Sequence, residues 1–306
     1  MELFDALRAR TSVRSYLTRV PGNRVQIDLL NYINNVPVLL PEADISIELL
    51  SFEDLLEYFP QEAEKMIKAP LYLAFKGNLD LYQFMNVGYY AEHAAIWLTG
   101  RDLASVWQTG FRIRQLQDDE ILDEIKLSQS KSKRGKAANL SSSNSESLIE
   151  SLENMTKPLM PAVLALGYSK QTTRRPASKK RLSKILLSDR SKINNNVLSL
   201  LEAARLAPSE YNTQPWRFAV EDENLIHIFM KEPILFNSLQ RQYMRQVSMG
   251  CALGNMEIMA ALRGIRLDYG FMDDIPEYGQ SDDKLLYLGT IRIEKVYRQM
   301  MFGLDY

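Results

Sequence analysis

The order of segments in this 306-residue chain occurs twice, and that repetition constrains the fold more than any single motif. Residues 86–99 (NVGYYAEHAAIWLT) and 250–263 (GCALGNMEIMAALR) each have the apolar spacing of a buried helix. A glycine typical of a helix end follows each stretch, and setting Gly100 on Gly264 aligns the two. In a similar alignment a proline loop and then a strand precede each helix. We therefore predict a diverged tandem duplication.

The predicted boundaries place a first repeat at residues 1–168, a basic connector at 169–189 and a second, trimmed repeat at 190–306. Two copies that fold alike are expected to face each other across a pseudo-two-fold axis, as the subunits of a symmetric dimer do. The chain is long enough for one large domain or two modest ones. We expect one intertwined structural unit, and a monomer that acts as a pseudo-dimer.

Local patterns predict the elements between these helices. Apolar periodicity and proline stops predict helices at 2–8, 25–36 and 195–206. Apolar runs predict strands at 44–52, 68–76, 161–168, 217–220 and 225–230. Residues 128–147 are rich in Ser, Lys and Asn and predict a mobile surface loop. The basic run at 169–184 is typical of a solvated face or a linker.

Composition excludes several classes of protein. The formal net charge of −1 provides no overall attraction to nucleic acid or to an anionic membrane. One cysteine, Cys251, excludes an internal disulfide, and two histidines, His93 and His227, exclude a multi-histidine metal site. The N-terminal residues lack the apolar core of a secretory signal, and no apolar run is long enough to span a membrane. We therefore expect a cytoplasmic protein.

Known phosphate and nucleophile motifs are also missing. The sequence contains no G-x-x-x-x-G-K, no G-x-G-x-x-G after a strand, no C-x-x-C and no G-x-S-x-G. If a nucleotide binds, it does so without a Rossmann or P-loop cradle.

Two short segments carry the strongest chemical signals. Residues 207–218 (APSEYNTQPWRF) form a loop between two prolines that displays polar side chains suited to a planar heterocycle. From the residues alone, an ordinary helix-to-strand connection whose side chains satisfy the backbone is slightly favoured. In the segment Arg10-Thr-Ser-Val-Arg14, alternate residues share one face if the chain is extended, so Arg10, Ser12 and Arg14 are expected to face one ligand.

Residues 207–218 closely resemble the A-P-S-x-x-N-x-Q-P-W-x-F signature of the FMN-dependent nitroreductase family. Residues 7–16 (LRARTSVRSY) are similar to the family's first motif, R-x-S-x-R followed by an aromatic residue, and residues 161–175 look like its late strand and basic segment. The resemblance implies an α+β fold of mostly antiparallel sheets flanked by helices. It also implies an FMN at a subunit interface, contacted by the first motif of one subunit and the loop of the other.

The two motifs lie far apart in this chain, in different repeats, which is similar to the single-chain, pseudo-dimeric branch of the superfamily. In our alignment Ile45 stands in the first repeat where the loop asparagine is expected, and the second repeat lacks R-x-S-x-R. One intact FMN site and one lost site follow from this pattern.

The resemblance assigns roles to individual residues. The FMN phosphate would be held by Arg10, Ser12, Arg14 and Arg174, because a phosphate prefers paired guanidinium groups. The ring and ribityl chain would contact Pro208, Ser209, Glu210 and Asn212, while Gln214 braces the loop. Glu210 departs from the family's usual small residue. Most of the neighbouring basic residues, Arg175, Lys179, Lys180 and Arg181, are expected to be solvated.

The redox end of the flavin would lie by the backbone amides of Thr109 and Gly110, near N5 and O4. Lys65 would lie near the pyrimidine edge, where a cation favours the anionic reduced flavin. A surface position is at least as plausible for Lys65 from the residues alone. His93 and Cys251 are expected to be packing residues on buried helices.

The implied activity is an oxidoreductase in which NAD(P)H reduces the flavin by hydride transfer and a nitroaromatic, quinone or similar small molecule then accepts the electrons. No side chain needs to act as nucleophile or acid, since the flavin supplies the chemistry. Two alternatives remain open: a protein that stores flavin without rapid turnover, and a cofactor-free scaffold whose basic stretch docks an acidic partner.

Overall fold

The computed structural model describes residues 1–40, 45–59, 65–77, 81–109, 159–171, 176–231, 239–275, 278 and 285–295. The predicted loop at 128–147 lies outside these ranges, as do Gly110 and Arg174.

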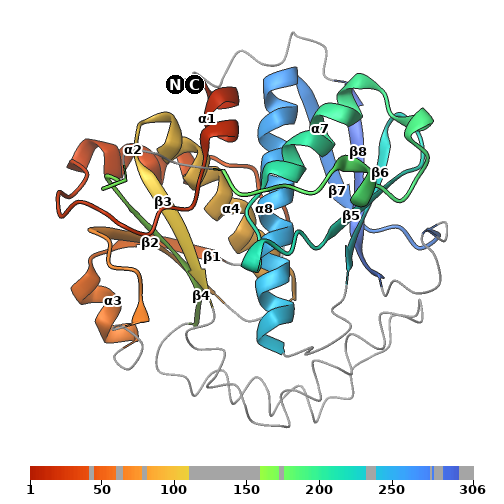
Figure 1. Ribbon diagram of the computed structural model, residues 1–306. Helices are drawn as coiled ribbons and strands as arrows, with labels where there is room; N and C mark the ends of the chain where they lie inside the picture. The colour runs from red at the N-terminus through yellow and green to blue at the C-terminus, as the bar shows by residue number, and fades with distance from the viewer. Residues whose placement is uncertain are drawn as a thin grey trace, which may run out of the picture.

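Two antiparallel sheets with the same strand order flank a pair of central helices (Figure 1). The first sheet has the order β1-β2-β4-β3, with bounds β1 Ile45–Leu50, β2 Leu71–Gly77, β3 Ala104–Thr109 and β4 Leu159–Gly167. The second has the order β5-β6-β8-β7, with bounds β5 Trp216–Val220, β6 Leu225–Lys231, β7 Ile265–Gly270 and β8 Leu285–Lys295. Identical topology in both halves confirms the α+β fold with an internal duplication.

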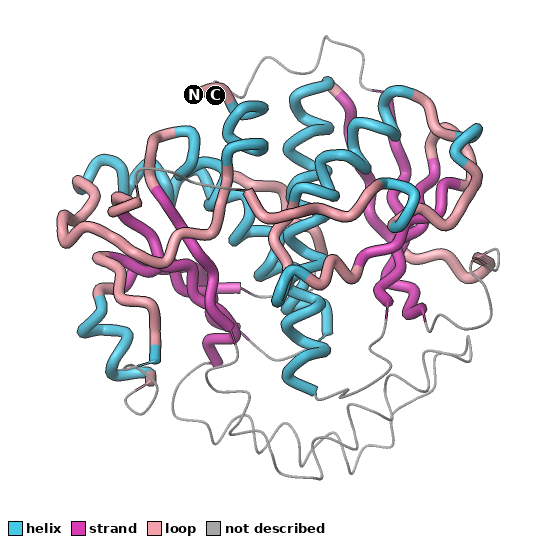
Figure 2. The backbone as a smooth tube through the Cα atoms, in the orientation of Figure 1, coloured by secondary structure: helices cyan, strands magenta, loops and turns pink. Residues whose placement is uncertain are grey.

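The helices lie mainly between the sheets (Figure 2). Their bounds are α1 Leu3–Ala9, α2 Asn23–Asn34, α3 Phe52–Tyr58, α4 Leu81–Gly100, α7 Asn195–Leu206 and α8 Leu239–Arg263. The central helices α4 and α8 both begin earlier than predicted. In α8, polar residues such as Gln240, Arg241 and Gln242 dilute the apolar signal of the first turns. In the described part of the chain, no helix has the length and apolar character needed to cross a membrane.

Two glycines let α4 and α8 approach closely. A Cβ at Gly88 of α4 would lie 1.9 Å from the carbonyl oxygen of Val247, and a Cβ at Gly250 of α8 would lie 1.9 Å from that of Met85. The two contacts are reciprocal, as contacts across a two-fold axis are. Only glycine permits this backbone approach, so the helix crossing depends on both positions.

This reciprocity corrects the predicted alignment of the repeats. Gly88 pairs with Gly250 and Met85 with Val247, so equivalent residues are 162 positions apart in these helices. The equivalent of Gly264 is therefore Asp102 rather than Gly100. Both residues have left-handed backbone, with φ of 64° and 57°, and both follow the helix end. Aspartate tolerates this conformation better than most residues, which hid the equivalence from a search for glycine.

The strand alignment changes as well. β1 begins at Ile45 and β5 begins at Trp216, so Ile45 is equivalent to a strand residue and does not replace Asn212. The second repeat forms a short 3-10 turn, Glu210–Asn212, between its proline and its strand. The connection from helix to strand has nine residues in the second repeat and ten in the first, so Asn212 lies within the loop and not opposite the first residue of β1.

One large core joins the two halves. The inward faces of both sheets pack on α4, α8 and α7 through alternate strand residues such as Leu73 and Ile228. A second, smaller core lies on the outer face of the first sheet, where Leu55 of α3 packs near Tyr72. We did not predict α3, although a capping box of Ser51 and Asp54 marks its start.

Candidate functional site

The Arg10–Arg14 segment follows α1 and runs beside β3. The Val13 amide donates to the Ser105 carbonyl at 3.1 Å, and Ser12 and Ser105 form a parallel bridge. Arg10 is only 9% exposed, Ser12 is half-buried and Arg14 is exposed. The three side chains therefore sit at increasing exposure, with Arg10 turned into the protein.

Arg10 forms a buried ion pair that the sequence did not predict. Its Nε lies 3.2 Å from Oε1 of Glu92 on α4, and both side chains are almost fully buried. Burial raises the pKa of Glu92 to about 7, and the nearby cations Arg10 and Lys179 oppose that rise. A lone glutamate among alanines and tyrosines at 86–99 was the available signal for this residue.

Lys179 connects this ion pair to the proline loop of the second repeat. Its Nζ donates to the Ala207 carbonyl at 2.6 Å, and it interacts electrostatically with both Arg10 and Glu92. Burial, helped by Arg10, lowers the pKa of Lys179 to about 8. Lys179 is therefore an exception to the expectation that most residues of the basic run are solvated, because the connector folds back against the loop. The first motif and the loop thus meet around one cluster.

The side chains of the loop largely hold the loop itself. The Gln214 amide donates to Ser209 Oγ at 2.9 Å, and Gln214 Oε1 accepts from the Lys180 amide at 2.7 Å. Asn212 Nδ2 donates to the Ser178 carbonyl at 2.8 Å. The bracing role predicted for Gln214 is confirmed, and Asn212 shares it. A contact of Asn212 with a ligand stays a prediction.

Two further loop residues predicted to contact the ligand are buried against the helix layer. The amide of Glu210, which is 5% exposed, donates to Ser248 Oγ of α8 at 3.0 Å. Pro208 is buried as well. The loop is therefore anchored to the same central helix that carries the Gly250 crossing.

The loop has a strained backbone. Tyr211, Asn212 and Gln214 have φ of 43°, 57° and 49°, in the left-handed region that few non-glycine residues adopt. Tyr211 is also 82% exposed, so packing does not explain its conformation. Strain of this kind persists where the surrounding structure enforces it, and it concentrates at functional sites.

The far end of β3 gathers the remaining predicted residues. Thr109 is the last residue of β3, and Gln108 Oε1 accepts from the Ile67 amide at 2.8 Å. That bond brings Lys65, an exposed residue two positions before Ile67, near the Thr109 end. From Ser105 to Thr109 the strand covers about 13 Å. β3 thus runs from the Arg10 cluster to Lys65.

The charge of the Arg10 cluster suits an anion. Glu92 contacts Arg10 through Nε, and among the described residues the terminal nitrogens of Arg10 have no protein partner. The buried Thr11 hydroxyl also lacks a hydrogen-bond partner within the described ranges. Arg10 and Lys179 together outweigh Glu92, so the cluster is positive. These features fit a phosphate group. No cluster of metal-binding side chains occurs in the described residues.

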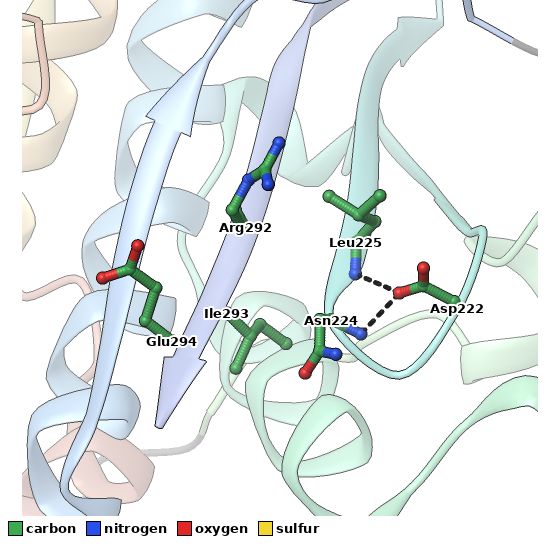
Figure 3. Close-up of a pocket in the computed structure, with 6 residues that line it drawn as sticks. All are labelled: Asp222, Asn224, Leu225, Arg292, Ile293 and Glu294. Carbon is green, nitrogen blue, oxygen red and sulfur yellow. Dashed lines mark hydrogen bonds between the residues drawn. The ribbon is translucent and has the colours of Figure 1, made fainter. Parts of the chain in front are cut away.

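A shallow groove lies elsewhere, at the opposite end of β5 from the loop (Figure 3). It has a volume of about 440 Å³, and its lining residues are Asp222, Asn224, Leu225, Arg292, Ile293 and Glu294. Asp222 Oδ1 accepts from the amides of Asn224 and Leu225, so this carboxylate stabilises its own turn. The groove is separate from the cluster around Arg10.

The fold is similar to that of a solved structure that covers nearly the whole chain. A "putative nitroreductase" from Thermotoga maritima is 17% identical, with 96% of this chain and 93% of that chain covered and a TM-score of 0.53. A "putative NADH dehydrogenase/NAD(P)H nitroreductase" from Bacteroides thetaiotaomicron is 18% identical over 60% of this chain and 95% of its own, with a TM-score of 0.39. An "FMN-dependent nitroreductase" from Clostridium difficile is 13% identical over 56% and 90%, with a TM-score of 0.37.

No curated protein matches the chain significantly. The sequence family described as "Putative TM nitroreductase" matches residues 2–129 and 136–260. These two regions include both motifs of the candidate site and cover well over half of the chain. The chain therefore belongs to this family of nitroreductase-like proteins, as its sequence motifs and its duplicated fold both indicate.

Proposed function

We propose that the protein is an FMN-dependent oxidoreductase that takes electrons from NAD(P)H and passes them to a small acceptor such as a nitroaromatic or a quinone. The family is that of nitroreductase-like oxidoreductases. The observation that carries the finer proposal is the positive Arg10–Lys179 cluster, where the first motif of one repeat meets the proline loop of the other.

The proposed roles follow the position of each residue along β3. Arg10, Ser12 and Arg14 would hold the FMN phosphate at the Ser105 end. Lys65 and the Thr109 amide would lie toward the ring, at the other end of the strand. Loop residues Pro208, Ser209, Glu210 and Asn212 would close the site from the second repeat. Gly110 and Arg174 keep the ring and phosphate roles proposed for them from the family motifs.

The bound flavin would supply hydride and electron transfer, and the protein would supply orientation and charge. Arg10 and Lys179 neutralise a phosphate, while the braced loop limits the positions that a planar group can take. Both tasks need a rigid frame, which the α4–α8 crossing provides. No described side chain has to act as a nucleophile in this scheme.

An absorption spectrum tests the proposal directly. Purified protein titrated with FMN should bind about one equivalent and show a perturbed flavin band. Anaerobic mixing with NADH or NADPH should bleach that band, and a nitroaromatic or quinone should restore it. Absence of FMN binding contradicts the proposal, and persistent colour after mixing with both nucleotides indicates a storage protein instead.

A matched pair of variants tests the phosphate end. Arg10→Ala and Arg14→Ala should weaken FMN binding at least tenfold and leave riboflavin binding nearly unchanged, because riboflavin lacks the phosphate. Arg292→Ala, in the separate groove, is the control with one arginine removed elsewhere. Equal losses for FMN and riboflavin would refute the phosphate assignment.

A further inference from the structure

Glu92 is a buried acid beside the proposed phosphate site, and the family resemblance assigned it no role. It lies on α4 with its side chain fully buried, and it contacts Arg10 through Oε1. The charged or titratable groups that interact with it come from three elements: Arg10 after α1, Lys179 of the connector and the Cys251 thiol on α8. Arg205 of α7 interacts electrostatically with Lys179.

The geometry of the ion pair separates two edges of the Arg10 guanidinium. Glu92 lies at the Nε edge, 3.2 Å away. The terminal nitrogens carry no partner among the residues that the structure describes, and a small part of the side chain remains exposed. Nε is the guanidinium nitrogen of this ion pair, although neither Glu92 carboxylate oxygen has a hydrogen-bond partner in the described part of the chain. The terminal fork of a guanidinium matches the oxygens of a phosphate.

We propose that Glu92 is the positioning residue of this anion site: its carboxylate pairs with Arg10 on the Nε side, leaves the terminal nitrogens for a phosphate group, and takes up a proton when that group binds. The inference rests on the proposed function, since FMN provides the phosphate.

Charge balance explains the proton. With Glu92 ionised, Arg10 and Lys179 leave the cluster at about one net positive charge. A phosphate monoester brings about −1.5 to −2 at neutral pH, so the occupied cluster would become negative in a buried setting. Protonating Glu92 relieves that excess. The pKa of Glu92 is already about 7 from burial, and an added anion raises it further, so the proton goes to this carboxyl.

Isothermal titration calorimetry in two buffers of different ionisation enthalpy measures this proton. At pH 7 a group with a pKa of about 7 is half protonated, so FMN binding should take up about half a proton. Riboflavin, without a phosphate, should take up almost none. The FMN affinity should fall about tenfold between pH 7 and pH 8, because Glu92 must gain a proton on binding and Lys179, with a pKa of about 8, must keep its own.

Three variants separate positioning from simple packing. Glu92→Gln should bind FMN with an uptake of about 0.1 proton or less, which is the amount that Lys179 alone should contribute. Glu92→Asp keeps the titrating group and should restore most of the uptake with weaker affinity. Glu257→Gln is the matched control, since Glu257 also lies on a central helix with a pKa raised by burial to about 7 but faces Arg266. It should retain half a proton.

The outcomes distinguish the two proposals. If neither FMN nor riboflavin binds, the proposed function fails and takes this inference with it. If FMN binds wild-type protein without proton uptake at pH 7, or Glu92→Gln keeps the full uptake, the inference is overturned while the function stands. If Glu92→Gln does not fold, the role of Glu92 is tested by the proton uptake of the wild-type protein, by the pH dependence of its FMN affinity, and by the proton uptake of Glu92→Asp.

Discussion

The two repeats share a frame and differ at the positions that chemistry uses. Both have the same strand order, and Gly88 and Gly250 make the same contact from opposite sides of the crossing. Glu92 of the first repeat corresponds to Gly254 of the second, and a Cβ at Gly254 would lie 3.1 Å from the Tyr89 carbonyl. One side of the crossing therefore holds a buried acid with two cations, and the other side is closed by backbone.

The two repeats also differ on the outer faces of their sheets. In the first repeat, α3 covers an apolar cluster that includes Tyr72. In the second, buried His227 joins Thr290 through Nδ1 at 2.8 Å and Glu221 through Nε2 at 2.7 Å. Duplication thus preserved the backbone contacts that set the crossing, while side chains on each surface changed. The shared features should respond to mutation alike, and the divergent ones should not.

The largest effect is expected at the crossing. Gly88→Ala and Gly250→Ala should each lower the free energy of unfolding by at least about 3 kcal/mol, since the new methyl meets backbone that cannot move without parting the helices. Chemical denaturation of both variants measures this. Gly22→Ala, whose Cβ meets nothing within 4 Å, should change stability by less than about 1 kcal/mol. Clearly unequal losses of unfolding free energy in the two variants would contradict the structural equivalence of Gly88 and Gly250.

The next largest effect is on the pH dependence of the free energy of unfolding, to which Glu92 and His93, neighbours on α4, contribute with opposite signs. Burial lowers the pKa of His93 to about 3, from an ordinary 6.5, and raises that of Glu92 to about 7, from 4.5. Between pH 4.5 and 6.5 the unfolded chain binds the proton that folded His93 refuses, so His93 makes stability rise with pH. Folded Glu92 keeps a proton that the unfolded chain loses, so Glu92 makes stability fall with pH.

Relative to wild type, His93→Gln should therefore make the slope of unfolding free energy against pH more negative by about 1 kcal/mol per unit between pH 5 and 6. Glu92→Gln should make it more positive by a similar amount. Urea titrations at several pH values give the slopes. Two variants that shift the slope in the same direction would show that the assignment of the two burial effects is wrong.

A smaller effect is expected where the two central helices end. Gly264→Ala should cost about 1–2 kcal/mol, because an alanine pays for the left-handed φ of 64°. Asp102→Gly, at the equivalent position with φ of 57°, should stay within about 0.5 kcal/mol of wild type. The Asp102 and Leu103 amides donate to Thr99 and Leu98, the bonds of a Schellman end that glycine preserves. Thermal and urea unfolding together resolve this pair.

The smallest effect concerns a strain that belongs to the second repeat. Tyr211→Asn should stabilise the protein by about 0.5–1 kcal/mol, since asparagine accepts a φ of 43° more readily than tyrosine does. Val38→Asn is the control in the loop of the first repeat, where Val38 is 53% exposed and has no left-handed backbone. An equal gain in both variants would mean that lost surface hydrophobicity, not backbone strain, is responsible.

Much of the secondary structure was predictable from local patterns. The helix predicted at 195–206 has those bounds, because Asn194 caps its start and Pro208 follows its end. The strands at 225–230 and 161–168 were placed within two residues of their observed limits. β3, β7 and β8 were not predicted, since β-propensity depends strongly on the neighbours against which a strand packs. The offset between the repeats was also missed, because it depends on which glycines touch.

Some residues of the candidate site were likewise predictable from the sequence, and others were not. The two motifs and the bracing role of Gln214 were readable from residue order, because prolines and short polar side chains act locally. Glu92 and Lys179 were not. Burial shifts the pKa of both groups, and the groups that interact with them lie in segments far apart in the sequence, from Arg10 to Cys251.

Sequence alone therefore determined the repeated order, the family motifs and the dependence on local turns, since all of these rest on interactions between residues close in the chain. Tertiary structure decided the register of the repeats, the side of the crossing that keeps an acid, and the pairing of Arg10 with Glu92. Desolvation and backbone contact between distant elements are properties of the packed chain, so no local pattern contains them.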